Sequence, residues 1–241
     1  MSLLEYPHIF EGHLLPKHHS LPEINPGTDL VWPSVFLLGC LVLLVIIKVT
    51  AFPKVIKLIQ SCFNMQAWRQ LEREEFNPFK SYSVLLSIFF FLNLTFFIYK
   101  VNSVYHLVLT ERSPFQQFAF IFLATLVLLG FKGAVNKLLS LFIGDTRLIP
   151  EFVYSTFVIS QTFGLFLFPC LVLAELSSFN NNLFLSAGFV ILAASQLFKW
   201  YRGVLFGFIE HRVGLLQTFV YFCALEILPV LVMVKFIIEK F

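Results

Sequence analysis

The side chain that most invites chemistry in this sequence is Glu226, which lies inside the apolar run "YFCALEILPVLVMVKF". An ionised carboxylate in the hydrocarbon region of a membrane is costly unless it is protonated or closely paired. We therefore predict a mostly protonated carboxyl that forms a hydrogen bond with Gln161 or Asn93, two polar side chains expected at a comparable depth. Pro229, three residues later, has no N–H to donate and disturbs the helix beside this carboxyl.

Glu226 has two interpretations, and both stay open. In the first, it is the proton-binding site of a coupled transporter, which is the default interpretation of an intramembrane acid. In the second, it forms a structural hydrogen bond beside a kink. We expect neither a second acid nor a buried cation at this depth to relay a proton.

A second group of polar side chains lies around the connection between the last two apolar runs, in "KWYRG" and "IEHR". With one basic residue from an earlier connection, the candidate residues are Lys132, Lys199, Arg202, Glu210, His211 and Arg212. This group can bind a phosphate, a lipid headgroup or a partner protein at the cytoplasmic edge. The alternative is that these residues only anchor the chain through the positive-inside rule, with local ion pairs.

Other kinds of chemistry find little support in the sequence. Glu74 and Glu75 precede an Asn-Pro turn and are typical of a solvated helix end. The N-terminal histidines have spacings that fit no ordinary structural zinc site. We find no motif for a catalytic nucleophile or a phosphate loop. We therefore predict no catalytic residue, metal, cofactor or nucleic-acid partner.

The elements that position these residues follow from the composition. The chain has 241 residues, of which 58% are apolar and only 13% are charged. A helix needs about 20 mainly apolar residues to cross the hydrocarbon core. Six runs qualify, and they predict an all-α, polytopic transmembrane helical bundle with spans near residues 30–47, 83–99, 115–131, 152–173, 183–197 and 214–237.

The distribution of Lys and Arg predicts the orientation of these spans. Alternate connecting segments carry 12 of these residues on one side and 5 on the other. Cytoplasmic loops carry the excess of Lys and Arg. We therefore expect a multi-pass protein of the bacterial inner membrane with both termini in the periplasm.

Two connecting segments have the character of amphipathic helices. In "FPKVIKLIQSCFNMQAWRQLEREEF" apolar residues recur at helical spacing, and "KGAVNKLLSLFIG" is similar. We predict one or two interfacial helices, on the inner membrane surface or against the bundle. The expected organisation is a polar periplasmic tail, residues 1–29, followed by a single transmembrane domain, residues 30–241.

The segments "RQLEREEFNPF", "YRGVLFGF" and "YFCALEILPVLVMVK" resemble an uncharacterised inner-membrane protein family of Bacteroidota, domain of unknown function family 4271. The likeness covers most of the chain after about residue 48 and is sharpest at the last run. Glu226 with Pro229 and Arg202 with Gly203 match the family pattern, whereas the apolar surroundings of "FNPF" depart from it. The resemblance implies a bacterial inner-membrane location but no activity and no catalytic residue.

Three functions are compatible with these observations. The first is a non-enzymatic membrane component that binds a partner or lipid in envelope biogenesis. The second is a small proton-linked transporter centred on Glu226, and the third is an enzyme that modifies a membrane lipid. We favour the first because intramembrane polar residues are few and no catalytic set is visible. Its expected partners are membrane lipids, with an envelope protein or a homo-oligomer as further possibilities.

Overall fold

The computed structural model describes residues 31–64, 66, 68, 81–105, 113–143, 148–177 and 181–210. These residues form five long helices: α1 (Val31–Phe63), α3 (Ser81–Tyr105), α4 (Pro114–Ile143), α5 (Leu148–Leu176) and α6 (Asn181–Glu210). The described part of the chain contains no β-strand. All five helices are long and apolar enough to cross a membrane.

The first five predicted spans fall within these helices, so the all-α, membrane-spanning class is confirmed for them. The helices extend beyond the predicted runs: α1 continues to Phe63 and α4 continues to Ile143. Residues 132–143, which include the segment we described as similar to an interfacial helix, are a direct continuation of α4. The sixth predicted span, residues 214–237, and the tail, residues 1–29, lie outside the described residues.

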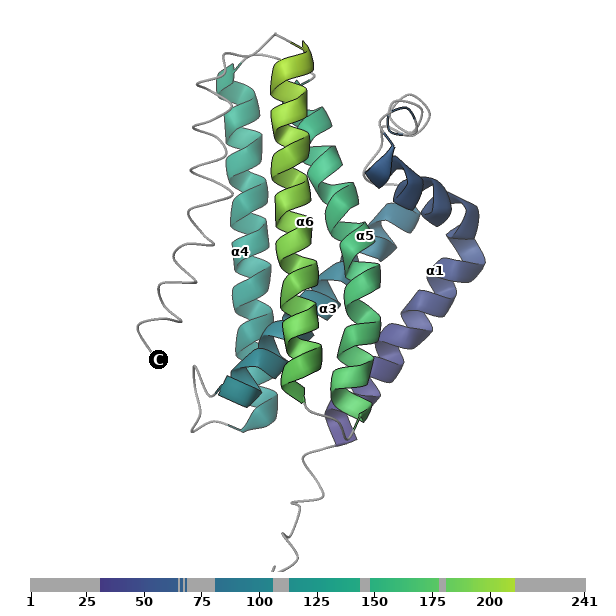
Figure 1. Ribbon diagram of the computed structural model, residues 1–241. Helices are drawn as coiled ribbons and strands as arrows, with labels where there is room; N and C mark the ends of the chain where they lie inside the picture. The colour runs from purple at the N-terminus through teal and green to yellow at the C-terminus, as the bar shows by residue number, and fades with distance from the viewer. Residues whose placement is uncertain are drawn as a thin grey trace, which may run out of the picture.

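Helix α5 packs against each of the other four described helices (Figure 1). One end of the bundle joins the beginning of α1 to the end of α3 and the beginning of α4, through ring contacts of Trp32 with Tyr99 and Phe115. We call it the Glu175 end, after the acidic residue near the end of α5. The opposite end, where α1 finishes and α5 begins, is called the Arg202 end.

Phenylalanine supplies much of the contact between helices, as expected of a chain that contains 32 Phe residues. Phe36 of α1 stacks on Phe96 of α3 with 5.1 Å between ring centroids. Two glycines let α5 and α6 approach α3 closely. A Cβ atom on Gly164 of α5 would lie 2.8 Å from Cδ2 of Phe90, and one on Gly188 of α6 would collide with the Phe97 ring. Small residues permit close helix packing in membranes, where dispersion contacts replace the hydrophobic driving force.

Helix α1 bends where its apolar run finishes. Ala51 has non-helical dihedral angles (φ −143°, ψ 18°), and Pro53 follows two residues later. Proline cannot donate the backbone hydrogen bond, and its ring clashes with the preceding turn. Residues 31–50 extend ~30 Å at ~1.5 Å per residue, about the thickness of the hydrocarbon core. The bend therefore comes at the point where a straight span would leave the lipid.

After the bend, one face of α1 packs on the bundle and the other remains exposed. Leu58 and Cys62 are buried at helical spacing, whereas Lys54 and Lys57 are exposed. This pattern agrees with the apolar spacing read from the sequence. The position of this segment at the membrane interface stays a prediction.

Candidate functional site

The candidate site is a buried cation, Arg202, on the inward face of α6. The side chains that turn inward recur every three or four residues, from Leu185 and Gly188 near the Glu175 end to Ser195, Lys199 and Arg202 near the Arg202 end. The inward face of one helix thus changes from apolar to polar along its length. Arg202 is only 3% exposed.

The guanidinium of Arg202 is held by residues near the end of α1. Its Nη2 donates a hydrogen bond to the carbonyl oxygen of Ser61 at 3.0 Å. The last turn of a helix has carbonyl groups without intrahelical partners, so such an oxygen is available. The same guanidinium lies over the ring of Trp68, 4.2 Å from the centroid. The Trp68 ring in turn contacts Tyr154 of α5, at 5.5 Å between centroids.

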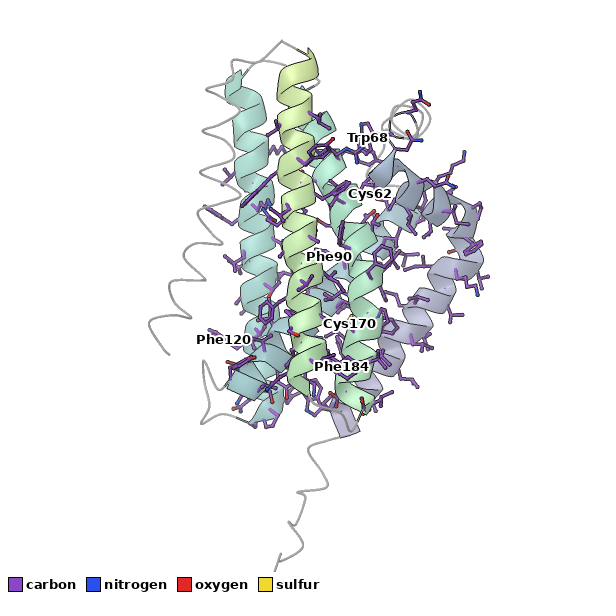
Figure 2. All side chains as sticks on the ribbon, in the orientation of Figure 1. Cys62, Trp68, Phe90, Phe120, Cys170 and Phe184 are labelled. Atoms are coloured by element: carbon purple, nitrogen blue, oxygen red, sulfur yellow. The ribbon has the colours of Figure 1, made fainter. Side chains whose placement is uncertain are left out.

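Two further polar groups lie close to Arg202. The Cys62 thiol lies beside the Thr162 hydroxyl and within electrostatic range of the guanidinium. The Thr162 hydroxyl itself donates to the Val158 carbonyl at 3.0 Å. Figure 2 places Cys62 and Trp68 together at this end of the bundle. Arg202 therefore lies at the junction of α1, α5 and α6.

The hydrogen bonding of Arg202 is incomplete in one respect. Its Nη1 is buried and has no hydrogen-bond partner in the structure. Glu175 is the one carboxylate among the side chains that the structure describes, and it lies near the finish of α5, at the other end of the bundle. The described surroundings of Arg202 thus supply a neutral carbonyl and a ring but no anion.

The structure groups only some of the residues expected at the basic edge. Lys199 lies one helical turn from Arg202 on the same inward face and is 9% exposed. Lys132 lies on a different helix, α4, and is half-buried. Glu210 is the last residue of α6, and only its backbone is described, whereas His211 and Arg212 lie outside the described residues.

The intramembrane polar residues are buried but lie at two levels of α3. Gln161 donates through Nε2 to the Ser87 hydroxyl at 2.7 Å and to the Ser83 carbonyl at 2.9 Å. Asn93 donates through Nδ2 to the Phe89 carbonyl at 2.7 Å. Because Asn93 is six residues beyond Ser87, the two levels are separated by ~9 Å along the helix.

Each of these amides keeps one acceptor unused. Oε1 of Gln161 and Oδ1 of Asn93 are buried without a hydrogen-bond partner in the structure. Glu226 and Pro229 lie outside the described residues, so the hydrogen bond expected between Glu226 and one of these amides stays a prediction.

An ion pair between Lys100 of α3 and Glu175 of α5 was missed by sequence reasoning. The side chains are 18% and 6% exposed. We had assigned both residues to connecting segments. Their positions in the sequence could have indicated this ion pair. Each residue follows a predicted span by one or two residues, and both spans are predicted to end on the same side of the membrane.

The described residues contain no group of three or more His, Cys, Asp or Glu side chains that could hold a metal ion. The buried guanidinium of Arg202 offers a positive charge and N–H donors, which is chemistry that can recognise an anion. Arginine suits this task because its planar fork of N–H donors fits phosphate and carboxylate oxygens.

Comparison with known proteins gives one match. The model of a family described as a domain of unknown function, DUF4271, matches residues 34–237. The matched range begins inside α1 and finishes at the last residue of the sixth predicted span. No curated protein and no solved structure matches this chain.

Proposed function

Since this chain belongs to the DUF4271 family, whose description names no activity, we propose a function from its geometry. It is a non-enzymatic inner-membrane protein with six spans and both termini in the periplasm. Its Arg202 end faces the cytoplasm and binds an acidic lipid headgroup or partner in envelope biogenesis. Of the two ligands we favour the headgroup, because Lys54 and Lys57 are exposed just beyond the apolar run of α1.

One observation carries this proposal: among the described side chains, the one carboxylate lies at the Glu175 end, whereas most of the cations lie toward the other end. The Glu175 end has an acid–base pair. Toward the other end the described cations are Lys48, Lys54, Lys57, Lys132, Lys137, Lys199 and Arg202. The cytoplasmic leaflet carries anionic lipids that attract basic residues by about 1 kcal/mol for each Lys or Arg near its surface. The second half of α1, with Lys54 and Lys57 exposed, serves as the interfacial helix.

Lipid selectivity tests this function. We expect the purified protein to retain phosphatidylglycerol over phosphatidylcholine when native mass spectrometry compares the two lipids at equal concentration. Neutralising the exposed lysines of α1 with Lys54→Gln and Lys57→Gln should reduce that preference. The matched control, Lys54→Arg with Lys57→Arg, keeps the charge and should keep the preference. Equal retention of both lipids by the wild-type protein would contradict the proposal.

A second function, proton-linked transport centred on Glu226, is favoured by one specific observation. The unused acceptors of Gln161 and Asn93 are buried, and an unpaired buried acceptor costs about 1–3 kcal/mol. A protonated carboxyl is a donor that satisfies such an acceptor.

Infrared spectroscopy tests this second function. We expect a protonated-carboxyl stretching band that responds to a pH step and is absent from Glu226→Gln. A wild-type spectrum without this band would count against the transport site. The third alternative, a lipid-modifying enzyme, gains no support from the described side chains, among which there is one carboxylate and no histidine.

A further inference from the structure

One terminal nitrogen of the Arg202 guanidinium, Nη2, forms a hydrogen bond, whereas the other, Nη1, forms none among the described residues. The Trp68 ring covers one face of the guanidinium, and the Ser61 carbonyl accepts from Nη2. These contacts fix the plane and direction of the fork. Nη1 is then the donor group left without a partner.

An unused donor on a buried cation is unfavourable. Leaving a buried charged group without its hydrogen bond costs more than leaving a neutral group unpaired. The fold nevertheless orients the guanidinium with two contacts and supports Trp68 with Tyr154. A site that is preorganised in this way around an unfilled donor has the character of a binding site whose ligand completes it.

The charge around the site defines what that ligand must be. Lys199 lies one turn away on the same inward face, and side chains three residues apart on a helix are neighbours. The ligand is therefore an anion, and one with several oxygens suits a fixed guanidinium fork. Lipid phosphate is an abundant anion at the level of a membrane where a span finishes.

A headgroup would approach Arg202 from the lipid-facing side of α6. Tyr201 and Val204, next to Arg202 in α6, are 60% and 48% exposed. They lie on the outer face of the helix, whereas Arg202 lies on its inward face. The headgroup must therefore enter between α6 and a neighbouring helix while its acyl chains remain in the bilayer.

We propose that Arg202, positioned by Ser61 and Trp68 at the junction of α1, α5 and α6, forms a specific subsite for the phosphate group of an anionic membrane lipid. This proposal rests on the proposed function and adds a defined site to it. Nη1 donates to a phosphate oxygen, and Lys199 adds a second positive charge one turn away. The Trp68 ring and the Ser61 carbonyl act as positioning groups.

Lipid titration with matched variants tests the subsite. In native mass spectrometry with phosphatidylglycerol, we expect Arg202→Gln to weaken binding about tenfold or more, as for the loss of a charge-assisted hydrogen bond. Arg202→Lys keeps the charge but loses the fork, so it should fall between Arg202→Gln and the wild type. The comparison variant Lys54→Gln removes one exposed charge of the proposed binding surface, so it should weaken binding less than Arg202→Gln does, by less than about threefold.

A measurement on the wild-type protein keeps the proposal testable if Arg202→Gln fails to fold. With ¹⁵N-labelled arginine and phosphatidylglycerol vesicles, solid-state nuclear magnetic resonance should detect dipolar coupling between a guanidinium nitrogen and lipid phosphorus. Arg202→Lys should remove this coupling.

Three results would overturn the subsite. The first is the absence of nitrogen–phosphorus coupling at Arg202. The second is an unchanged lipid affinity in Arg202→Gln, which would leave the proposed function intact if Lys54→Gln with Lys57→Gln still weakens binding. The third is complete displacement of the lipid by inorganic phosphate, which would identify a soluble phosphate as the ligand. Loss of all preference for anionic lipid in the wild type would instead overturn the proposed function.

Discussion

Each end of the bundle holds a cation that is at least partly buried, and the two ends differ in how that charge is balanced. At the Glu175 end, Lys100 forms an ion pair with Glu175 between α3 and α5. At the Arg202 end, the guanidinium contacts a carbonyl oxygen and an indole ring, and its Nη1 has no partner in the structure. The first arrangement pairs the cation with an anion, whereas the second leaves a donor unused among the described residues.

This difference separates a structural role from a recognition role. Removing one member of a buried pair leaves the other charge buried and uncompensated, which costs about 3–5 kcal/mol. The described residues hold no carboxylate near Arg202, so removing this cation leaves no buried anion among them. The same class of side chain is therefore expected to stabilise one end of the protein and to bind a ligand at the other.

The largest expected effect is a difference in thiol labelling between the two ends, because we expect them to lie on opposite sides of the membrane. With the four native cysteines replaced by alanine, cysteine substitutions can be made at Asn64, beyond the last turn of α1, and at Asn182, in the first turn of α6. Both side chains are exposed. A membrane-impermeant thiol reagent applied from the periplasm should label Asn182→Cys and not Asn64→Cys. Labelling both from one side would remove the basis of the comparison.

The next largest effect is expected at the Glu175 end. Glu175→Gln leaves the Lys100 ammonium largely buried without its carboxylate, so we expect a loss of about 3 kcal/mol in the free energy of unfolding. Thermal melting followed by size-exclusion chromatography in detergent measures this as a lower Tm.

A double replacement provides the control for that result. Lys100→Met with Glu175→Leu removes both charges and keeps apolar side chains of similar volume, which is often neutral or stabilising. Its Tm should therefore recover toward the wild-type value. An equal loss in the single and double variants would show that packing, and not the ion pair, is what the Glu175 end requires.

A smaller effect is expected along the contact of α3 and α5, which joins the two ends. A Cβ atom at Gly164 would lie 2.8 Å from Cδ2 and 3.2 Å from Cα of Phe90. A backbone atom cannot move away easily, so Gly164→Ala should destabilise the protein by about 1–3 kcal/mol. At Gly188 the nearest atom is the far side of the Phe97 ring, which can rotate, so Gly188→Ala should cost less. The same melting assay ranks the two variants, and the reverse order would contradict this account.

The helices were predictable from sequence for a physical reason. In lipid, every backbone N–H and C=O must be satisfied within the chain, so a run of about 20 apolar residues has few options besides a helix. This constraint weakens outside the hydrocarbon core. Helix α4, for example, continues to Ile143, well past its apolar run. The helix boundaries were therefore less predictable than the helices themselves.

The candidate site was only partly predictable. Arg202 was identified from its position at the basic edge, but not its burial or its partners. Its acceptor is a backbone carbonyl 141 residues away, which no residue type encodes. Trp68 was not singled out as a site residue from the sequence, because its contact with Arg202 joins two segments that are far apart in the chain.

The smallest expected effect on stability comes from replacing Arg202. A small change in Tm there, against a large one at Lys100, is what distinguishes the two ends. Arg202→Met loses a charge-assisted hydrogen bond worth about 1.5–3 kcal/mol and a cation–π contact, but it also removes the cost of a buried charge. These terms oppose each other, so we expect a Tm close to that of the wild type. Lys100→Met, which replaces the other buried cation and leaves Glu175 unpaired, is the matched comparison and should lower the Tm clearly. Similar losses in both variants would mean that Arg202 has an anionic partner within the chain and that both ends are structural.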